Sequence, residues 1–592
     1  MFCTRRSSIF PRNLTSLLLR PPLKASSSPF LARTASTLPK LPLFEAISSH
    51  DPKSTAVIHS ASGRRFTYGQ LLHDVAERRD RLANEAGQKG LEGERIAFLV
   101  ENSYDYVAVP LSPAFPAHEL QYILDQSEAS MLLSSTKFES KAREVTSAVL
   151  EAKPTHVDLE KKLENLDHGR VTLEAASEGK GAMMLYTSGT TNRPKGVLLP
   201  QSVLTAQSKS LIEAWDYSPR DHLLHVLPLH HIHGIVNAIL APLFSGSTIE
   251  FLFPFNATAV WQRFAAPFLP NPKIQEPITF FTVVPTVYNR LLATHKNLPL
   301  EIQSAAQQAI SPPNLRLNIS GSAALPTPTK NAWSALSSNN ILLERYGMTE
   351  VGMALSCGLS PADRVDGSVG WPLPSVQVRL VDTETHEVIL PGAELDANGK
   401  ERDGEIQLRG PTIFKEYWRN PEATEKEHVQ DSDGGGRWFK TGDVAVRRSV
   451  ASAGNNSSTQ QWAQGPMYFI RGRKSADIIK TGGEKVSALE VEREMLSLPQ
   501  IAECAVCAVP SGSWGQKIGA VVVLNDAYLA GQKWRPLDLR RALKDRLAPY
   551  KIPQLMRVVE HIPRNAMGKI NKKELVERVF MDDDDVGGDD DM

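Results

Sequence analysis

Residues 186–196 read YTSGTTNRPKG, a run of hydroxyl side chains and glycines that contains two cations. Glycine lets the backbone turn inward, and hydroxyl groups with a lysine supply hydrogen-bond donors for phosphate oxygens. A Walker loop requires glycine directly before its lysine and serine or threonine directly after it. Here Pro194 precedes Lys195 and Gly196 follows, so the stretch is not a Walker loop. From these residues alone, it is either a phosphate-binding loop of another class or a polar surface loop.

The composition excludes several classes of protein before any other motif is considered. The chain has 592 residues, of which 41% are hydrophobic, so it can form several buried cores. Lysine plus arginine equals aspartate plus glutamate at 66 each, which argues against a nucleic-acid-binding field. No apolar run approaches the roughly 18 residues that a membrane-spanning helix needs. We therefore expect a soluble protein, with neither nucleic acid nor an integral membrane anchor among its partners.

The first 40 residues have the composition of a targeting segment. Arginines and serines are frequent there, and no acidic residue precedes Glu45. This combination is typical of a mitochondrial transit peptide, although an ordinary disordered tail can share it. We predict a transit peptide over residues 1–40 and a location in the mitochondrial matrix. Residues 579–592 are predicted to form a solvated acidic tail without a chemical role.

Cysteine and histidine give little support to a metal site. Cys504 and Cys507 form a lone pair in the apolar run AECAVCAVP (502–510), which predicts a strand. Residues three apart on a strand face opposite sides, so these thiols are poorly placed to share a metal. His231 and His233 would share one face of a strand, but no nearby cysteine or acidic residue completes a ligand set. We expect no metal at either place.

The order of apolar runs predicts layers of helices and sheets. Strand-like runs such as RIAFLV (95–100) alternate with helical ones such as YGQLLHDVAERRDRLANEA (68–86), whose apolar positions recur every three or four residues. Such alternation favours an α/β architecture with parallel sheets. After the hinge-like segment that follows Gly472, the pattern changes to a compact unit of two helices and three strands. We therefore place a domain boundary between Gly472 and Asp477.

Seven motifs follow the opening loop in a characteristic order. They read LPLHHIHG (227–234), ISGSAALP (319–326), ERYGMTE (344–350), GEIQLRGP (404–411), WFKTGDVA (438–445), IRGRKSADIIKTGGEKVSALEVE (470–492) and PRNAMGKINK (563–572). This series resembles the adenylate-forming superfamily, which includes acyl-CoA synthetases, firefly luciferases and peptide-synthetase adenylation domains. Within it, malonyl-CoA synthetases are most similar in four segments: LPLHHIHG, VVPTVYNRL (283–291), LNISGSAALP (317–326) and residues 472–492.

The resemblance implies both a fold and a reaction. The expected fold is α/β, with a large N-terminal multi-subdomain α/β domain of the adenylate-forming type over residues 41–472. A small, mobile C-terminal α+β domain is expected over residues 473–578. The expected reaction is the ATP-dependent ligation of a carboxylic acid to coenzyme A, with Mg²⁺ as cofactor. The acid and ATP first give an acyl-adenylate and pyrophosphate, and the thiol of coenzyme A then displaces AMP.

The resemblance also assigns an ATP site. It implies that the ring of Tyr346 stacks on adenine, that Gly321 and Ser322 lie near the base, and that Gly347 belongs to the same site. The loop that gathers the β- and γ-phosphates would consist of Thr187, Ser188, Gly189, Thr190, Thr191, Asn192, Arg193, Pro194 and Lys195.

Further roles follow from the same resemblance. Asp443 would accept hydrogen bonds from both ribose hydroxyls, which suits a side chain with two acceptor oxygens, and Arg473 would lie near the ribose. Thr349 would donate to the α-phosphate, and Glu350 would coordinate Mg²⁺. Lys569 would bridge the ribose and the reacting carboxylate and stabilise the transition state. Taken without its motif, Lys569 would be interpreted as a solvated surface charge.

Coenzyme A is expected at a glycine turn of the small domain. Gly482 and Gly483 resemble the loop that lines the pantetheine tunnel in the second of two domain poses. Glycine at both positions would let the backbone pass close to the ligand.

Basic side chains in the expected acyl pocket indicate which carboxylic acid is the substrate. A dicarboxylate would place a second anion in the pocket, which must be paired or solvated. Arg290 and His231 lie in segments that are similar to malonyl-CoA synthetases, and a guanidinium can bind a carboxylate through two N–H groups. We predict that Arg290 selects malonate and that His231 lies at the floor of the pocket. Alternatively, Arg290 is an ordinary helix-surface residue.

The chain departs from the family pattern at two places. Asn192 replaces the usual glycine of the phosphate loop, and asparagine is the non-glycine residue that best tolerates a positive φ. At the second place, ENSYDYVA (101–108) continues directly into VPLSPAFPAHEL (109–120), where the family has about a dozen more residues. Either the N-terminal sheet of this isoform is damaged, or the sequence reflects a mis-assigned splice junction. We favour the second explanation.

Several functions stay open at this stage. Ligation of malonate to coenzyme A is the leading hypothesis, and a medium-chain fatty acid or a specialised-metabolite carboxylate is the alternative substrate. A peptide-synthetase module is less favoured, because no carrier domain follows Lys569. An inactive remnant that binds nucleotide or a partner is the hypothesis of another class, and it would account for the gap after Ala108.

Overall fold

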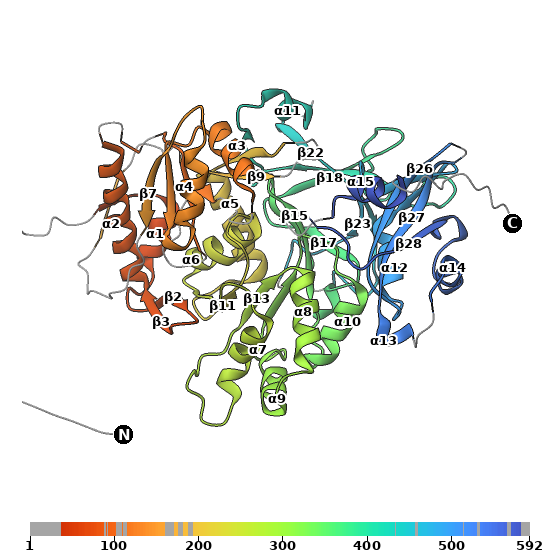
Figure 1. Cartoon of the computed structure of the whole chain (residues 1–592), viewed down its shortest axis with the longest axis horizontal. Coiled ribbons are helices and arrows are strands. Elements are labelled where there is room, and N and C mark those ends of the chain that lie inside the picture. The colour runs from red at the N-terminus through yellow and green to blue at the C-terminus, as the bar shows by residue number, and fades with distance from the viewer. Residues whose placement is uncertain are drawn as a thin grey trace, which may run out of the picture.

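The computed structural model describes residues 37–87, 90–91, 93–101, 109–110, 115–159, 171–175, 181–187, 193–431, 434–455, 460–512, 514–529, 533–564 and 570–581. Most of the chain forms a large N-terminal part, and a small C-terminal part lies at one end of it (Figure 1). This confirms the predicted mixed α/β fold with a large and a small domain. No helix within the described ranges is both long and apolar enough to cross a membrane.

A 14-stranded sheet runs through the large part. The strands on one side of it pair in parallel, apart from an antiparallel edge strand, and those on the other side pair antiparallel. The predicted parallel pairing therefore accounts for only part of the sheet. In spatial order the strands are β18 (Gln377–Asp382), β19 (Gly404–Arg409), β22 (Arg437–Arg448), β23 (Met467–Arg473), β17 (Ser368–Pro372), β16 (Gly352–Ser356), β15 (Leu343–Met348), β14 (Leu317–Ser320), β13 (Phe280–Val283), β11 (His222–His225), β12 (Thr248–Phe251), β2 (Thr55–His59) and β3 (Arg64–Thr67), with β21 (His428–Gln430) paired to β22.

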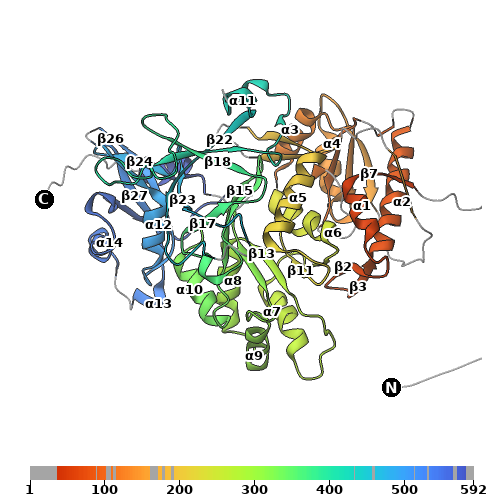
Figure 2. The same cartoon turned by 180° about the vertical axis from the view of Figure 1, so that it is seen from behind.

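Helices pack on both faces of the parallel half (Figures 1 and 2). Successive residues of a strand point to opposite faces. Leu223 of β11 and Phe280 of β13 therefore join one buried cluster, which includes residues of α5 (Gln201–Trp215). The next residue of each strand, Leu224 and Phe281, joins the other cluster. That cluster contains residues of α7 (Ala257–Ala265), α8 (Pro285–His295), α9 (Leu300–Ala309) and α10 (Thr327–Leu336).

A second sheet lies near the N-terminus of the large part. It is parallel, with the order β5 (Val109–Pro110), β4 (Ile96–Leu99), β6 (Met131–Ser135) and β7 (Thr155–Leu159). The helices α3 (Ala117–Ser127) and α4 (Glu139–Ser147) connect its strands, and α1 (Pro42–Ser49) and α2 (Tyr68–Ala86) precede it. The predicted helix over 68–86 is confirmed. A capping box fixes its start, because the Thr67 and Gln70 side chains each accept a hydrogen bond from the other's backbone N–H.

The connection between β4 and β5 is the place where the sequence is shorter than the family pattern. Ala97 of β4 pairs in parallel with Val109 of β5, so the chain crosses between neighbouring strands through residues 100–108. Residues 102–108 lie outside the described ranges. β5 is an edge strand of only two residues. The sheet is therefore present, and the benefit of a longer connection stays a prediction.

The end of the predicted transit peptide, residues 1–40, overlaps a short strand. Residues 37–39 form β1 (Thr37–Pro39), which pairs in parallel with β8 (Thr172–Glu174). Leu38 is 1% exposed, and the backbone N–H of Lys40 donates to the carbonyl of Glu174. Because these residues pair and pack, a leader that ended at residue 40 would remove a strand of the fold. Residues 1–36 lie outside the described part of the chain, so a shorter leader stays a prediction.

The small part is built on a five-stranded sheet. Its order is β25 (Glu484–Ser487), β24 (Ile478–Thr481), β27 (Gly515–Leu524) and β26 (Ile501–Ser511), with β28 (Leu555–Val558) paired to β27. Its α-helices are α12 (Ala488–Leu496), α13 (Asp526–Leu529), α14 (Pro536–Leu543) and α15 (Lys572–Val576). The predicted strand around the two cysteines is confirmed. Cys504 packs in one buried cluster and Cys507 in another, as expected for residues on opposite faces.

The segment LPLHHIHG (227–234) is not the strand that the sequence predicted. β11 ends at His225, and His233 begins the π-helix η3 (His233–Leu240), which α6 (Ala241–Ser245) continues. The backbone N–H of Ile235 donates to the carbonyl of His231, which is a helical turn rather than a strand pairing. The apolar run that follows His233 packs into the large core with helical spacing. The expectation that His231 and His233 share one face of a strand is therefore wrong.

Candidate active site

The predicted phosphate loop joins two antiparallel strands. β9 (Ala182–Thr187) ends at Thr187, the first residue predicted to bind phosphate, and β10 (Lys195–Pro200) begins at Lys195, the last one. Thr187 is paired with Lys195 across the hairpin. The hairpin thus brings these two predicted phosphate ligands side by side. The loop residues between them that lie outside the described ranges are Ser188, Gly189, Thr190, Thr191 and Asn192.

Helix α3 supports the second half of this loop. The hydroxyl of Tyr122 donates to the carbonyl oxygen of Pro194 at 3.2 Å. The guanidinium carbon of Arg193 lies 5.5 Å from the centroid of the Tyr122 ring, within the range of a cation–π contact. These two contacts fix the backbone immediately before Lys195.

Tyr417 links Lys195 to Glu350, two residues that were predicted for separate roles. It belongs to β20 (Glu416–Tyr417), which pairs with β10. The Lys195 Nζ lies 5.0 Å from the centroid of its ring, and its hydroxyl donates to Glu350 Oε1 at 2.9 Å. Burial and the Glu350 carboxylate raise the pKa of Tyr417, so this hydroxyl stays a donor. A buried carboxylate beside the phosphate loop has the hard oxygens that Mg²⁺ prefers, which fits the metal role predicted for Glu350.

Tyr346 and Asp443 are in direct contact. The Tyr346 hydroxyl donates to Asp443 Oδ2 at 2.6 Å, and Arg473 Nε donates to Asp443 Oδ1 at 3.0 Å. Burial and the Asp443 carboxylate raise the pKa of Tyr346. Asp443 and Arg473 are also paired across the neighbouring strands β22 and β23. Three residues that were predicted to surround the nucleoside are therefore brought together, and both oxygens of Asp443 are engaged.

Glycine is required at two predicted ATP-site positions by close approach of other groups. A Cβ at Gly321 would lie 2.5 Å from the guanidinium carbon of Arg345. A Cβ at Gly347 would lie 2.1 Å from the carbonyl oxygen of Gly352, across the hairpin between β15 and β16. Both distances are far shorter than a van der Waals contact. The neighbouring Ser322 adopts a positive φ of 68°, so the backbone at the end of β14 turns sharply.

Arg345 lies against the predicted base site and was missed by the sequence reasoning. Its Nη2 donates to Ser322 Oγ at 3.2 Å, and the residue is 3% exposed. Ser322 Oγ also lies 3.4 Å from Nδ1 of His233, whose Nε2 lies 2.7 Å from Thr282 Oγ1. Burial lowers the pKa of Arg345 to about 9, so its guanidinium is charged at neutral pH. Burial and the nearby charge of Arg345 lower the pKa of His233, so this imidazole is neutral there.

The two predicted acyl-pocket residues occupy different surroundings. His231 lies in the turn before η3, with its ring centroid 4.3 Å from that of His230. Arg290 is exposed on α8, and its guanidinium carbon lies 4.8 Å from the centroid of the Phe255 ring. Their roles in the acyl pocket stay predictions.

The remaining predicted residues lie on turns. Thr349 is in the turn between β15 and β16, next to Glu350. Gly482 and Gly483 form the turn between β24 and β25, with φ of 57° and 86°, a conformation that favours glycine. Lys569 lies outside the described residues, so its predicted role is not tested.

Sequence signals for the missed residues differ. Arg345 could have been found, because a cation inside the strand LERYGM, where the preceding residues are all buried, requires a partner or a ligand. Tyr417 lies in a segment without a motif. Its approach to Glu350 depends on the pairing of β20 with β10, which no local pattern predicts.

Comparison with known proteins identifies the family. The sequence profile of the AMP-binding enzyme matches residues 44–418, and that of the AMP-binding enzyme C-terminal domain matches residues 490–569. The chain belongs to the AMP-binding enzyme family. This agrees with the adenylate-forming fold and motif order that the sequence predicted.

Individual family members cover nearly the whole chain. It is 54% identical over 573 residues to a CoA ligase of Gibberella moniliformis (strain M3125 / FGSC 7600), covering 91% of this chain and 94% of that one. It is 38% identical over 544 residues to the human mitochondrial malonate–CoA ligase ACSF3, covering 86% and 88%. Among solved structures, ATP-bound MatB from Rhodopseudomonas palustris is 29% identical, with a TM-score of 0.69 over 90% of this chain and 98% of that one.

Proposed function

We propose that this AMP-binding enzyme is an ATP-dependent malonate–CoA ligase. A malonate carboxylate oxygen attacks the α-phosphorus of ATP, and pyrophosphate leaves with the electrons of the broken P–O bond. The thiol sulfur of coenzyme A then attacks the carbonyl carbon of malonyl-AMP, AMP leaves, and the thiol proton passes to solvent. The 38% identity to a human protein named malonate–CoA ligase supports the choice of acid.

The observation that carries the proposal is the buried cation of Arg345. No carboxylate of the described residues lies within ion-pairing distance of its guanidinium, although the residue is 3% exposed. A buried charge without a partner is unfavourable, so a site that keeps one is suited to an anionic ligand. Ser322, which Arg345 contacts, also lies 3.4 Å from His233 in the segment expected to form the acyl pocket, so we place Arg345 where the predicted base site meets that pocket. The second carboxylate of malonate, which stays ionised when the first is activated, would supply the anion. A fatty acid would leave Arg345 unpaired beside an apolar chain.

The arrangement around the phosphate loop suits the first step. ATP and a carboxylate repel each other, so the site must offset the negative charge that collects at the α-phosphate. Lys195 and the Thr187 hydroxyl would offset negative charge at the β- and γ-phosphates. Thr349 would do the same at the α-phosphate. Glu350 would hold Mg²⁺, which would add positive charge beside the phosphate oxygens. We also propose that Lys569 of the small part bridges the ribose and the reacting carboxylate and stabilises the transition state of adenylation.

The nucleoside would be held by the group around Asp443. The ring of Tyr346 offers a stacking face for adenine, and Asp443 offers two acceptor oxygens for the ribose hydroxyls. Arg473 Nε already donates to Asp443 Oδ1, which keeps that carboxylate oriented. The ribose would therefore replace the Tyr346 hydroxyl at Oδ2 rather than enter an empty acceptor site.

We further propose that the enzyme acts in the mitochondrial matrix. The arginine- and serine-rich composition before Glu45 and the mitochondrial location of the human relative named above both support this. Residues 1–36 fused to a fluorescent protein are expected to direct it to mitochondria. A cytosolic signal from this fusion would contradict the proposal.

The test of the proposed function is a panel of acids. Pyrophosphate release would be measured with malonate, methylmalonate, succinate, acetate and octanoate, each with and without coenzyme A. We expect malonate to give the highest kcat/KM and coenzyme A to convert a single turnover into continuous release. Highest activity with octanoate would instead favour a medium-chain ligase, and no release with any acid would favour an inactive protein.

A further inference from the structure

The large and the small part meet at a polar boundary. Every buried apolar cluster among the described residues lies wholly on one side of the segment 471–478. The clusters of the small part contain only residues from Ile479 to Phe580. Boundaries of this kind resemble transient interfaces rather than cores. The orientation of the small part therefore depends strongly on ion pairs and hydrogen bonds.

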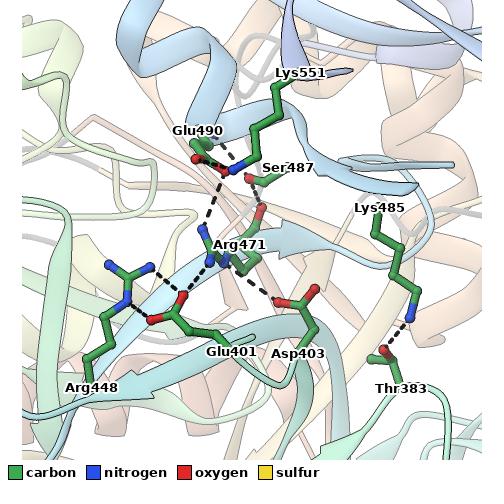
Figure 3. Close-up of polar contacts among 9 residues, drawn as sticks. All are labelled: Thr383, Glu401, Asp403, Arg448, Arg471, Lys485, Ser487, Glu490 and Lys551. Carbon is green, nitrogen blue, oxygen red and sulfur yellow. Dashed lines mark hydrogen bonds and ion pairs between the residues drawn. The ribbon is translucent and has the colours of Figure 1, made fainter. Parts of the chain in front are cut away.

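Arg471 of β23 is the centre of these polar contacts (Figure 3). Its Nη2 lies 2.7 Å from Glu401 Oε2, and its Nε lies 3.6 Å from Asp403 Oδ1, both in the large part. Its Nη1 lies 3.4 Å from Oε2 of Glu490, on α12 of the small part. The carbonyl oxygen of Arg471 also accepts a hydrogen bond from the Ser487 hydroxyl. One residue thus joins carboxylates from both sides of the boundary.

A second contact lies beside the first. Lys485 of β25 donates to Thr383 Oγ1 at 2.9 Å, as Figure 3 shows, and lies 2.8 Å from Glu384 Oε1. The neighbouring Glu484 lies 3.3 Å from the Nζ of Lys400. Burial raises the pKa of Asp403, although Arg471 and Lys485 both oppose this shift. We use the name clasp for five residues: Glu401, Asp403, Arg471, Lys485 and Glu490.

The clasp is adjacent to the turn of Gly482 and Gly483, which is expected to bind coenzyme A. A Cβ at Gly482 would meet only Trp514 of the small part, and one at Gly483 would meet nothing within 4 Å among the described residues. In this pose, neither glycine position therefore has a close neighbour in the described residues of the large part. Because Glu484 and Lys485 directly follow the turn, the clasp holds it where it is. Movement of the turn toward a ligand elsewhere would require these contacts to break.

The clasp is also adjacent to the nucleotide site. Arg471 and Arg473 lie two residues apart on β23, and Arg473 donates to Asp443. Gly472 between them has a φ of 128°, and a Cβ there would lie 2.4 Å from the Cβ of Asp477. The strand that orients Asp443 therefore also carries the residue that docks the small part.

We propose that Arg471 is a positioning residue, which through Glu490 holds the small part in the pose for adenylation and is released before thioester formation. This inference rests on the proposed two-step reaction. Weakening the pair should slow the first step while leaving the second step unimpaired. A residue with a merely structural role would slow both steps or neither.

The test compares Glu490→Gln and Arg471→Met with a matched control. Arg448→Met removes an ion pair to Glu401 that lies wholly within the large part. Malonate-dependent exchange of pyrophosphate into ATP, without coenzyme A, measures the first step. A chase of preformed enzyme-bound adenylate with coenzyme A measures the second. We expect both clasp variants to lose roughly fivefold in exchange, with the chase and the control within about twofold of the wild type.

A readout without catalysis separates this inference from the proposed function. Trypsin cleavage after Lys474, in the connection between the parts, should be faster in both clasp variants than in the wild type and in Arg448→Met. Raising the salt concentration should speed the wild-type cleavage toward the variant rate. If the wild type activates another acid instead of malonate, the malonate proposal fails, and the clasp is measured with that acid. Equal losses in both steps, or unchanged exchange and cleavage, would overturn the role of Arg471.

Discussion

The hydroxyl of Tyr346 donates a hydrogen bond to Asp443 Oδ2 at 2.6 Å. These are the two residues expected to hold opposite ends of the nucleoside, the adenine and the ribose. Arg473 occupies the other oxygen of Asp443 at 3.0 Å. Nucleotide binding must therefore break the hydrogen bond from Tyr346 before the ribose can donate to Asp443 Oδ2. The loss of that internal bond offsets part of the binding free energy gained from the ribose.

Tyr346→Phe tests this exchange. The substitution keeps the ring for stacking and removes the competing donor, so we expect the KM for ATP to stay unchanged or to fall by up to roughly fivefold. Tyr346→Leu, which removes the ring as well, should raise the KM. Steady-state kinetics with saturating acid measures both. A large increase in the KM of Tyr346→Phe would mean that the hydroxyl helps to bind the nucleotide.

Arg345→Leu should affect dicarboxylates selectively. The variant removes the buried cation, so kcat/KM for malonate should fall by roughly a hundredfold, while kcat/KM for acetate should change little. Arg345→Lys keeps a charge without the planar fork and should retain part of the activity. The thermal midpoint should not fall, because an unpaired buried charge has been removed. A parallel loss with malonate and acetate would contradict a role in acid selection.

Arg290→Leu tests the residue that the sequence placed in the acyl pocket. Arg290 is exposed on α8 and stacks over Phe255, so the structure leaves two roles for it. As a selector, its loss should shift the preference from malonate toward octanoate, measured by pyrophosphate release. As a surface residue, its loss should leave the preference unchanged, which would refute the selector role.

Acidification should destabilise the large part by protonating the Glu250 carboxylate. Burial alone would raise the pKa of this residue, but contacts with His222 and Arg263 lower it from 4.5 to about 2. A carboxyl group with a depressed pKa stabilises the fold above its unfolded pKa and loses this contribution as the pH falls. Between pH 4.5 and about 2, the wild type should lose up to roughly 3 kcal/mol of unfolding free energy through this group.

The Glu250 contribution is measurable as a slope. Urea unfolding at a series of acidic pH values should show a weaker pH dependence for Glu250→Gln than for the wild type. Glu301→Gln, at an exposed position of α9, is the matched control and should keep the wild-type slope. The same slope in all three proteins would exclude Glu250 as an acid-sensitive site.

Restoring a helix between Ala108 and Val109 should improve folding. The crossover from β4 to β5 spans only residues 100–108, and β5 is two residues long. A chain with about a dozen inserted helix-forming residues should give more soluble protein and at least equal activity. Soluble yield and pyrophosphate release of the two forms provide the comparison. Equal yield and activity would refute a gene-model error as the cause of a folding defect.

Local patterns predicted much of the fold. The helix over 68–86 and the strand around Cys504 and Cys507 follow from apolar spacing, and both are present. The strand expected at LPLHHIHG is absent, because a short apolar run fits a strand and a buried helix equally well. The antiparallel half of the large sheet depends on pairings between distant segments, such as β17 with β23, which periodicity does not encode.

The site was predictable where one motif carries one role. Thr187 and Lys195 were expected together and are paired in a hairpin, and Asp443 was expected near Arg473 and lies beside it. The role of Tyr417 depends on a tertiary contact of a segment without a motif. The clasp joins Arg471, Lys485 and Glu490 of the 470–492 motif to Glu401 and Asp403, and no motif predicts that pairing. Only the structure brings these contacts to notice.

The central claim is that malonate is activated as an adenylate, and oxygen transfer tests it most directly. The enzyme would be incubated with ATP, coenzyme A and malonate labelled with ¹⁸O in its carboxylates, and the products analysed by mass spectrometry. Attack of malonate on the α-phosphorus predicts that AMP carries one labelled oxygen and that malonyl-CoA forms in equal amount. Unlabelled AMP, or label in inorganic phosphate with formation of ADP, would contradict the account.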